Sequence, residues 1–188
     1  MADLESTLKT PRRARRASPK ASECLPAYGA GAGVLSFRHG LAVSDRNAID
    51  KALAIVGRCL ATDRSLSATP DAVKTYLQLK LAGEQAEHFA VLFLDVQNRF
   101  IAFEVMFPGT LTQASVYPRE IVRAALAHGA AAVVLAHNHP SGSVQPSKAD
   151  EMLTQTLKTT LALIDVSVLD HVIVAPGQAL SMAERGLM

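Results

Sequence analysis

The sequence lacks any apolar run long enough to cross a membrane. A spanning helix needs roughly 18 or more consecutive apolar residues, and no stretch of the 188 residues approaches that length. The N-terminus also lacks the continuous apolar core of a secretory signal, so we expect a cytoplasmic protein without a membrane partner. The hydrophobic fraction of 49% and the charged fraction of 19% are typical of a globular protein that can bury a real core.

Cysteine is scarce, with Cys24 and Cys59 as the two examples in the chain. Their spacing does not match that of a metal-binding motif, so the sequence does not support a closed, cysteine-rich zinc site. We expect both thiols to be buried or idle in a reducing compartment.

Positive charge is concentrated at the N-terminus. Residues 1–20 hold six basic and two acidic side chains, which leaves a net charge of +4 there and −2 on the rest of the chain. A basic tail can attract nucleic acid through the release of counterions, but a mildly acidic body is not typical of a dedicated DNA-binding protein. Two interpretations of the tail therefore stay open, a solvated leader and a weak nucleic-acid contact.

Three regions follow one another along the chain. Residues 1–45 mix Arg, Ser, Pro, Gly and Ala without a sustained period, which predicts a flexible basic leader. Residues 46–68 are expected to form a helix and a linker, because apolar side chains recur at helical spacing from residue 47 to residue 60. Residues 69–188 are expected to form the main functional domain.

Within that domain, helical and strand patterns alternate. The sequence predicts helices over 69–83, 118–129 and 148–163, and strands over 89–96, 100–107, 111–117, 130–139 and 168–175. This order indicates an α/β fold in which a mixed sheet is flanked by helices.

The segment "HNHPSGSVQPSKAD", residues 137–150, combines several groups that can bind a metal ion. At the end of a strand, His137 and His139 project to the same side while Asn138 faces away. Ser147 is placed to cap the next helix, which puts the carboxylate of Asp150 in its first turn. Two imidazoles and one carboxylate, with a fourth position open to water, are the ligands of a catalytic rather than a structural zinc site.

The same residues have a second interpretation that needs no metal. Ser-x-x-Asp before an apolar helix can be a capping arrangement, with Asp in place of the usual Glu, and two histidines at a strand end can be surface residues. The metal site is the interpretation that accounts for both histidines and the aspartate together.

A hydrolytic site also needs a base to move the proton of water. The candidate is Glu104, the single charged residue inside the apolar strand "FIAFEVMF". Asp170 and His171, in "LDHVIV", are either partners that orient a ligand or structural residues at the mouth of a strand. Both interpretations of that pair stay open.

The spacing of Glu104, His137, His139, Ser147 and Asp150 resembles the pattern of the JAMM (MPN+) metallopeptidases at every interval. The surrounding segments are similar to the RadC branch of that family over residues 49–188, namely "FLDVQNRFIAFEVMFPGTL", "YPREIVRAAL", "LAHNHPSG", "PSKAD" and "LDHVIV".

The resemblance implies a three-layer α/β/α fold akin to that of cytidine deaminases. It also implies one zinc ion held by His137, His139 and Asp150, with Glu104 as general acid and base. Ser147 would help to hold the oxyanion of the tetrahedral intermediate.

The function implied is zinc-dependent hydrolysis of a peptide or isopeptide bond in a peptide or protein substrate. The alternative is a DNA-associated accessory protein of the RadC repair type, with or without a metal-dependent nuclease activity. Longer RadC-like proteins carry a helix-hairpin-helix module ahead of the metal domain, and residues 1–48 contain no recognisable example. The substrate and the oligomeric state are not predicted.

Overall fold

The computed structural model describes residues 40–62, 69–109 and 116–188, all of which lie in one compact unit. In chain order, its helices and strands are α1 (Val43–Thr62), α2 (Pro70–Leu81), β1 (His88–Leu94), β2 (Phe100–Pro108), α3 (Pro118–His128), β3 (Ala132–Asn138), α4 (Lys148–Ala162), β4 (Ser167–Ala175) and β5 (Gln178–Ser181).

The strands form one mixed sheet in the order β2-β1-β3-β4-β5. β1 pairs antiparallel with both β2 and β3, β3 pairs parallel with β4, and β5 returns antiparallel along β4. A parallel pair needs a long crossover connection, and α4 lies in the one between β3 and β4. The mixed sheet expected from the sequence is confirmed.

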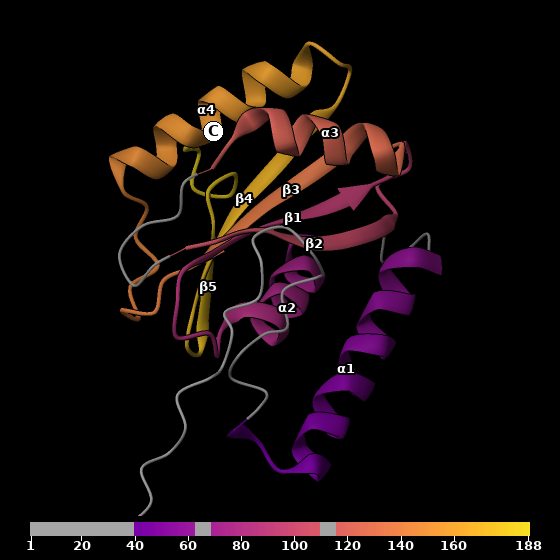
Figure 1. Cartoon of the computed structure of the whole chain (residues 1–188), viewed down its shortest axis with the longest axis vertical. Helices are drawn as coiled ribbons and strands as arrows, with labels where there is room; N and C mark the ends of the chain where they lie inside the picture. Colours follow the sequence, from indigo (N-terminus) through magenta and orange to yellow (C-terminus); the bar gives the residue numbers. More distant parts are fainter. Residues whose placement is uncertain (1–39, 63–68, 110–115) are drawn as a thin grey trace, which may run out of the picture. The chain divides into compact units, whose positions relative to one another are not determined.

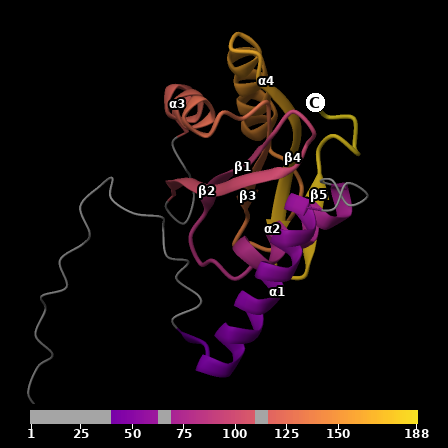
Figure 2. The same cartoon turned by 90° about the vertical axis from the view of Figure 1, so that its right-hand side faces the viewer.

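Helices cover both faces of this sheet, with α3 and α4 on one side and α2 on the other (Figure 1). On the first side, Ile121 of α3 and Leu157 of α4 pack against side chains such as Leu135 of β3. On the other side, Leu77 of α2 packs against the alternate residues of the strands. The turned view shows the same layers (Figure 2). The predicted three-layer α/β/α architecture is confirmed, and buried aliphatic side chains of β1 and β3 fill both interfaces.

Local signals in the sequence account for the helix ends. Thr69 caps α2, where its hydroxyl accepts a hydrogen bond from the amide of Ala72 at 3.4 Å, and Pro70 takes the first helical position. Gly129 ends α3 in the left-handed conformation, with φ of 60°. α1 begins at Val43, four residues before the predicted start.

Two expectations fall largely or wholly on residues outside those that the structure describes. They are the flexible leader, most of which precedes residue 40, and the strand predicted over 111–117, of which only Val116 and Tyr117 are described and neither is in a strand. β5 was not predicted. Within the described part of the chain, no helix is both long and apolar enough to span a bilayer.

Candidate metal centre

The end of β3 delivers two imidazoles to one side of the sheet. His137 is 2% exposed and lies opposite Phe89 of β1, so it faces the layer of α3 and α4. The amide of His139 donates to the carbonyl of Val174 at 2.8 Å, which extends the pairing with β4 beyond the last residue of β3. Side chains two residues apart on an extended chain point the same way, and the two rings lie 4.6 Å apart between centroids.

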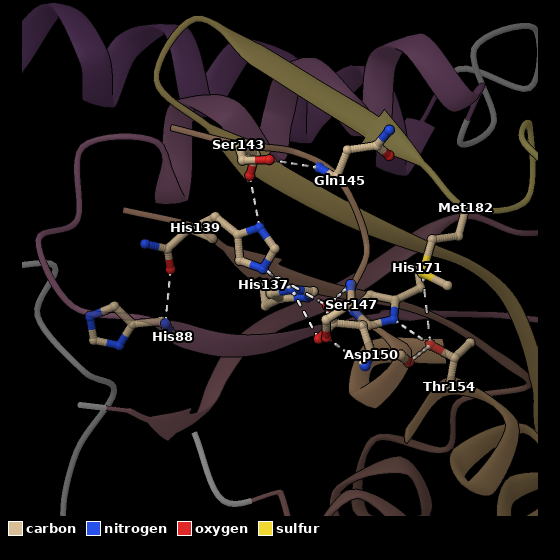
Figure 3. A network of polar contacts seen from close by, with 11 residues as sticks. His88, His137, His139, Ser143, Gln145, Ser147, Asp150, Thr154, His171 and Met182 are labelled. Carbon is tan, nitrogen blue, oxygen red and sulfur yellow. Dashed lines mark hydrogen bonds and ion pairs between the residues drawn. The ribbon is translucent and has the colours of Figure 1, made fainter. Parts of the chain in front are cut away.

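Asp150, in the first turn of α4, points towards these rings (Figure 3). The Nε2 atoms of His137 and His139 are 2.9 Å apart. The carboxylate oxygens of Asp150 lie 3.5 Å from Nε2 of His137 and 3.9 Å from Nε2 of His139. The structure therefore brings the three predicted ligands together, with one ligand atom from each inside a space 4.8 Å across.

The capping interpretation is also correct, and it does not compete with the metal interpretation. Ser147 Oγ accepts from the amide of Asp150 at 3.1 Å, and Asp150 Oδ2 accepts from the amide of Ser147 at 2.7 Å. The Ser147 hydroxyl donates to the same oxygen at 2.7 Å. The capping box fixes the aspartate with one oxygen, while the other, Oδ1, faces His137.

The hydrogen bonds of His139 leave its Nε2 atom as an acceptor. Its Nδ1 atom lies 2.7 Å from the carbonyl of Ser143, which accepts only, so Nδ1 carries the ring proton of the neutral imidazole. Nε2 then turns a lone pair towards Nε2 of His137 and the Asp150 carboxylate. Acceptors that face one another at such distances repel unless a cation lies between them, so this donor set fits a zinc ion.

Burial keeps the other imidazole neutral. It lowers the pKa of His137 to about 4; the nearby charge of Asp150 opposes this shift and that of His139 adds to it. A histidine must be neutral to bind a metal. At neutral pH His137 therefore has a lone pair available.

The structure does not bring Glu104 to this cluster. Glu104 of β2 lies opposite Val91 of β1, and β1 separates β2 from β3, so the backbone of Glu104 is two strand spacings, or about 10 Å, from the strand that carries the histidines. Its Oε1 atom instead lies 2.7 Å from Nε2 of His128, at the end of α3. The lone charge in an apolar strand thus has a different explanation, a hydrogen bond with a helix-end histidine, and its placement does not support the predicted role as base.

A different carboxylate, Glu87, lies beside the cluster. β1 and β3 run antiparallel with Phe89 opposite His137, so extending this register by two residues places Glu87 opposite His139 on the same face of the sheet. The carbonyl of Glu87 accepts from the amide of Gly109 at 2.6 Å, which holds the extended backbone there.

The electrostatic surroundings of Glu87 agree with this position. Burial raises the pKa of the Glu87 carboxyl, while the charge of His139 lowers it and that of Asp150 raises it. The two ligands therefore lie within electrostatic reach of this side chain. Glu87 was not predicted from the sequence, and the signal that could have found it is the antiparallel pairing of "FAVLFL" with "VVLAHN".

Asn138, between the two histidines, points to the opposite side and fastens the segment that carries Glu87. The side chain is 2% exposed. Its Oδ1 atom accepts from the amide of His88 at 2.8 Å, and its Nδ2 atom donates to the carbonyls of Ala86 at 2.9 Å and Glu84 at 3.4 Å. One amide thus ties the end of β3 to the residues on both sides of Glu87.

Asp170 and His171, the polar pair of "LDHVIV", have separate roles. His171 is fully buried, with its Nε2 atom 2.8 Å from Nδ1 of His137, so it is the partner of a candidate ligand. Asp170 Oδ1 accepts from the amides of His171 at 2.7 Å and Ala183 at 3.0 Å, and thereby holds the backbone.

The three-layer fold and the cluster at the end of its central strands define a domain of the JAMM/MPN class. Residues 67–187 match the family model of the RadC-like JAB domain. The chain belongs to this RadC-like family.

Curated relatives support the same assignment. The chain is 68% identical over 152 residues to a UPF0758 protein of Albidiferax ferrireducens and 66% identical over 152 residues to one of Verminephrobacter eiseniae. These matches cover 79% of the chain but only 65% and 64% of the relatives, so the chain spans just under two thirds of their length. A UPF0758 protein of a Polaromonas strain is 50% identical over 195 residues, with 98% of the chain and 87% of the relative covered.

Proposed function

We propose that this chain is a zinc-dependent hydrolase that cleaves peptide or isopeptide bonds, with zinc held by His137, His139 and Asp150. The observation that carries the proposal is the convergence of two imidazole lone pairs and a carboxylate, with the carboxyl of Glu87 beside them. Zinc bound there would supply a Lewis acid that activates water and polarises a carbonyl group.

In this proposal Glu87 moves the proton. Its carboxylate accepts a proton from the attacking water, the water oxygen bonds to the carbonyl carbon, and the proton is returned to the nitrogen as the carbon–nitrogen bond breaks. The pKa of Glu87 is raised by burial, which makes the carboxylate a stronger base than an exposed one.

The remaining predicted role is that of Ser147. Its hydroxyl donates to Asp150 Oδ2 in the structure, so we propose that it first orients a ligand. It can stabilise an oxyanion only after the hydroxyl rotates away from that carboxylate.

The proposal is tested by separating metal binding from proton transfer. Purified protein should contain about one zinc ion per chain and the His137→Ala variant much less. Glu87→Gln should keep its zinc and lose roughly 10²–10⁴ in the rate of cleavage of a peptide mixture followed by mass spectrometry.

Glu104→Gln is the matched control, because it also removes one carboxylate, from strand β2 of the same sheet, but should keep both zinc and rate. If Glu104→Gln loses the rate while Glu87→Gln keeps it, the assignment of the base is wrong. Loss of zinc in Glu87→Gln would make Glu87 a ligand instead.

The alternative, a DNA-associated accessory protein, rests on the net charge of +4 in residues 1–20. It requires binding to duplex DNA that weakens steeply as salt rises and disappears when residues 1–20 are deleted. A chain that binds DNA in this way and cleaves no peptide would favour the alternative.

A further inference from the structure

Thr154, one turn after Asp150 on α4, is fully buried beside the cluster. Its Oγ1 atom donates to the backbone carbonyl of Asp150 at 2.6 Å and also lies 2.6 Å from Nδ1 of His171 (Figure 3). A hydroxyl has one proton to donate. The carbonyl can only accept, so the hydroxyl donates its hydrogen bond there. The weakly accepting sulfur of Met182, 3.9 Å away, does not compete for that hydrogen bond.

The direction of the next two hydrogen bonds follows from that one. Because the Thr154 hydroxyl already uses its one hydrogen in the bond to the carbonyl of Asp150, it can only accept a hydrogen bond from His171. The ring proton of His171 is therefore on Nδ1. The Nε2 atom of neutral His171 is then an acceptor, and it lies 2.8 Å from Nδ1 of His137. His137 must donate from Nδ1, which leaves its Nε2 lone pair directed at His139 and Asp150.

We propose that Thr154 and His171 are positioning residues that set the tautomer of His137 and so present its Nε2 atom to zinc. The chain of bonds begins at the backbone of one ligand, Asp150, and ends at the ring of another, His137, so it also couples α4 to β3 through β4. The proposal rests on the proposed zinc function, and it adds two residues that lie outside the candidate ligand set.

The packing around His171 keeps this chain of bonds in place. The ring is 0% exposed and packs edge-on against Phe89, with centroids 5.7 Å apart and planes at 70°. A ring held in this way cannot turn to exchange its two nitrogens without displacing neighbours. The hydroxyl of Thr154 therefore decides which nitrogen carries the proton.

Thr154→Val is the decisive variant, because valine has nearly the shape of threonine and lacks the hydroxyl. We expect zinc affinity, measured on the full chain by competition with a chromophoric chelator, to fall about 10–100-fold. Imidazole ¹⁵N spectra of the zinc-free protein should show the His137 proton on Nδ1 in the wild type. In the variant they should show a mixture of the two neutral tautomers. Thr154→Ser, which keeps the hydroxyl, should restore both results.

Thr156→Val is the matched control. Thr156 lies on the same helix and donates to the carbonyl four residues earlier at 2.9 Å, but it is exposed and contacts no histidine in the described structure. It should leave zinc affinity and the His137 tautomer unchanged. Far-UV circular dichroism and urea unfolding of each variant would show that the comparison is made on folded protein.

The outcomes separate this proposal from the one on which it rests. If the wild type binds no zinc, the proposed function fails, and the ¹⁵N spectra still decide whether Thr154 sets the tautomer. If the wild type binds zinc and Thr154→Val binds it equally well, the positioning role is overturned. Weaker zinc binding with an unchanged tautomer would overturn it too, because the effect would then come from packing.

Discussion

Replacing Asn138 with alanine should destabilise the zinc-free domain by about 2–4 kcal/mol. The amide makes hydrogen bonds of 2.8, 2.9 and 3.4 Å to backbone groups of His88, Ala86 and Glu84. Each bond contributes about 0.5–1.5 kcal/mol, and the buried backbone groups left without a partner add to the loss. In a chain of this size the change corresponds to a fall in melting temperature of very roughly 5–15 °C.

The measurement is urea unfolding in the presence of a chelator. The chain contains no tryptophan, so far-UV circular dichroism is the natural signal. Asn47→Ala, at an exposed position of α1, is the control and should stay within about 0.5 kcal/mol of the wild type.

Asn138→Asp sharpens the prediction. Aspartate keeps an acceptor for the amide of His88 but turns its second oxygen towards the carbonyl oxygens of Ala86 and Glu84, in a buried position. It should be at least as unstable as Asn138→Ala at neutral pH. A loss below about 0.5 kcal/mol in both variants would refute the reasoning that Asn138 fastens the segment carrying Glu87.

Two further predictions concern stability. Burial lowers the pKa of His137 to about 4 and that of His171 well below its usual value. The unfolded chain binds these protons near pH 6.5 and the folded chain does not, so the zinc-free protein should lose stability as the pH falls from 6.5 towards 4. The loss should be about 3 kcal/mol for His137 alone. A urea midpoint that stays the same or rises when the pH is lowered from 7 to 5 would contradict this. Gly129→Ala should cost about 1 kcal/mol by the same assay, because φ is 60° there and an added methyl group meets nothing within 4 Å, so the cost is conformational. An unchanged midpoint would show that the left-handed cap is not needed.

Much of the fold could be predicted because its signals are local. Pro118 and Gly129 mark the two ends of α3, and the capping residue Ser147 marks the start of α4. No local sequence signal predicts that β1 lies between β2 and β3, because the order of strands depends on contacts between segments far apart in the sequence. β5, with four residues, is too short to produce a recognisable pattern.

The same division between local and long-range information runs through the candidate site. His137, His139 and Asp150 lie within 14 consecutive residues, so strand alternation and a helix cap were enough to predict their convergence. The position of the proposed base depends on strand order, and the prediction of Glu104 required β2 to lie next to β3, whereas β1 lies between them. His171 stayed undecided for the same reason, because only the parallel pairing of β3 with β4 places it beside His137.

The two oxygens of Asp150 have different neighbours, and this has a consequence for loading and unloading of the metal. One oxygen accepts hydrogen bonds from the amide and hydroxyl of Ser147, while the other faces His137. At the proposed zinc site, a chelator should therefore remove the ion and leave the Asp150 carboxylate in position, so that zinc can bind again without refolding of the domain.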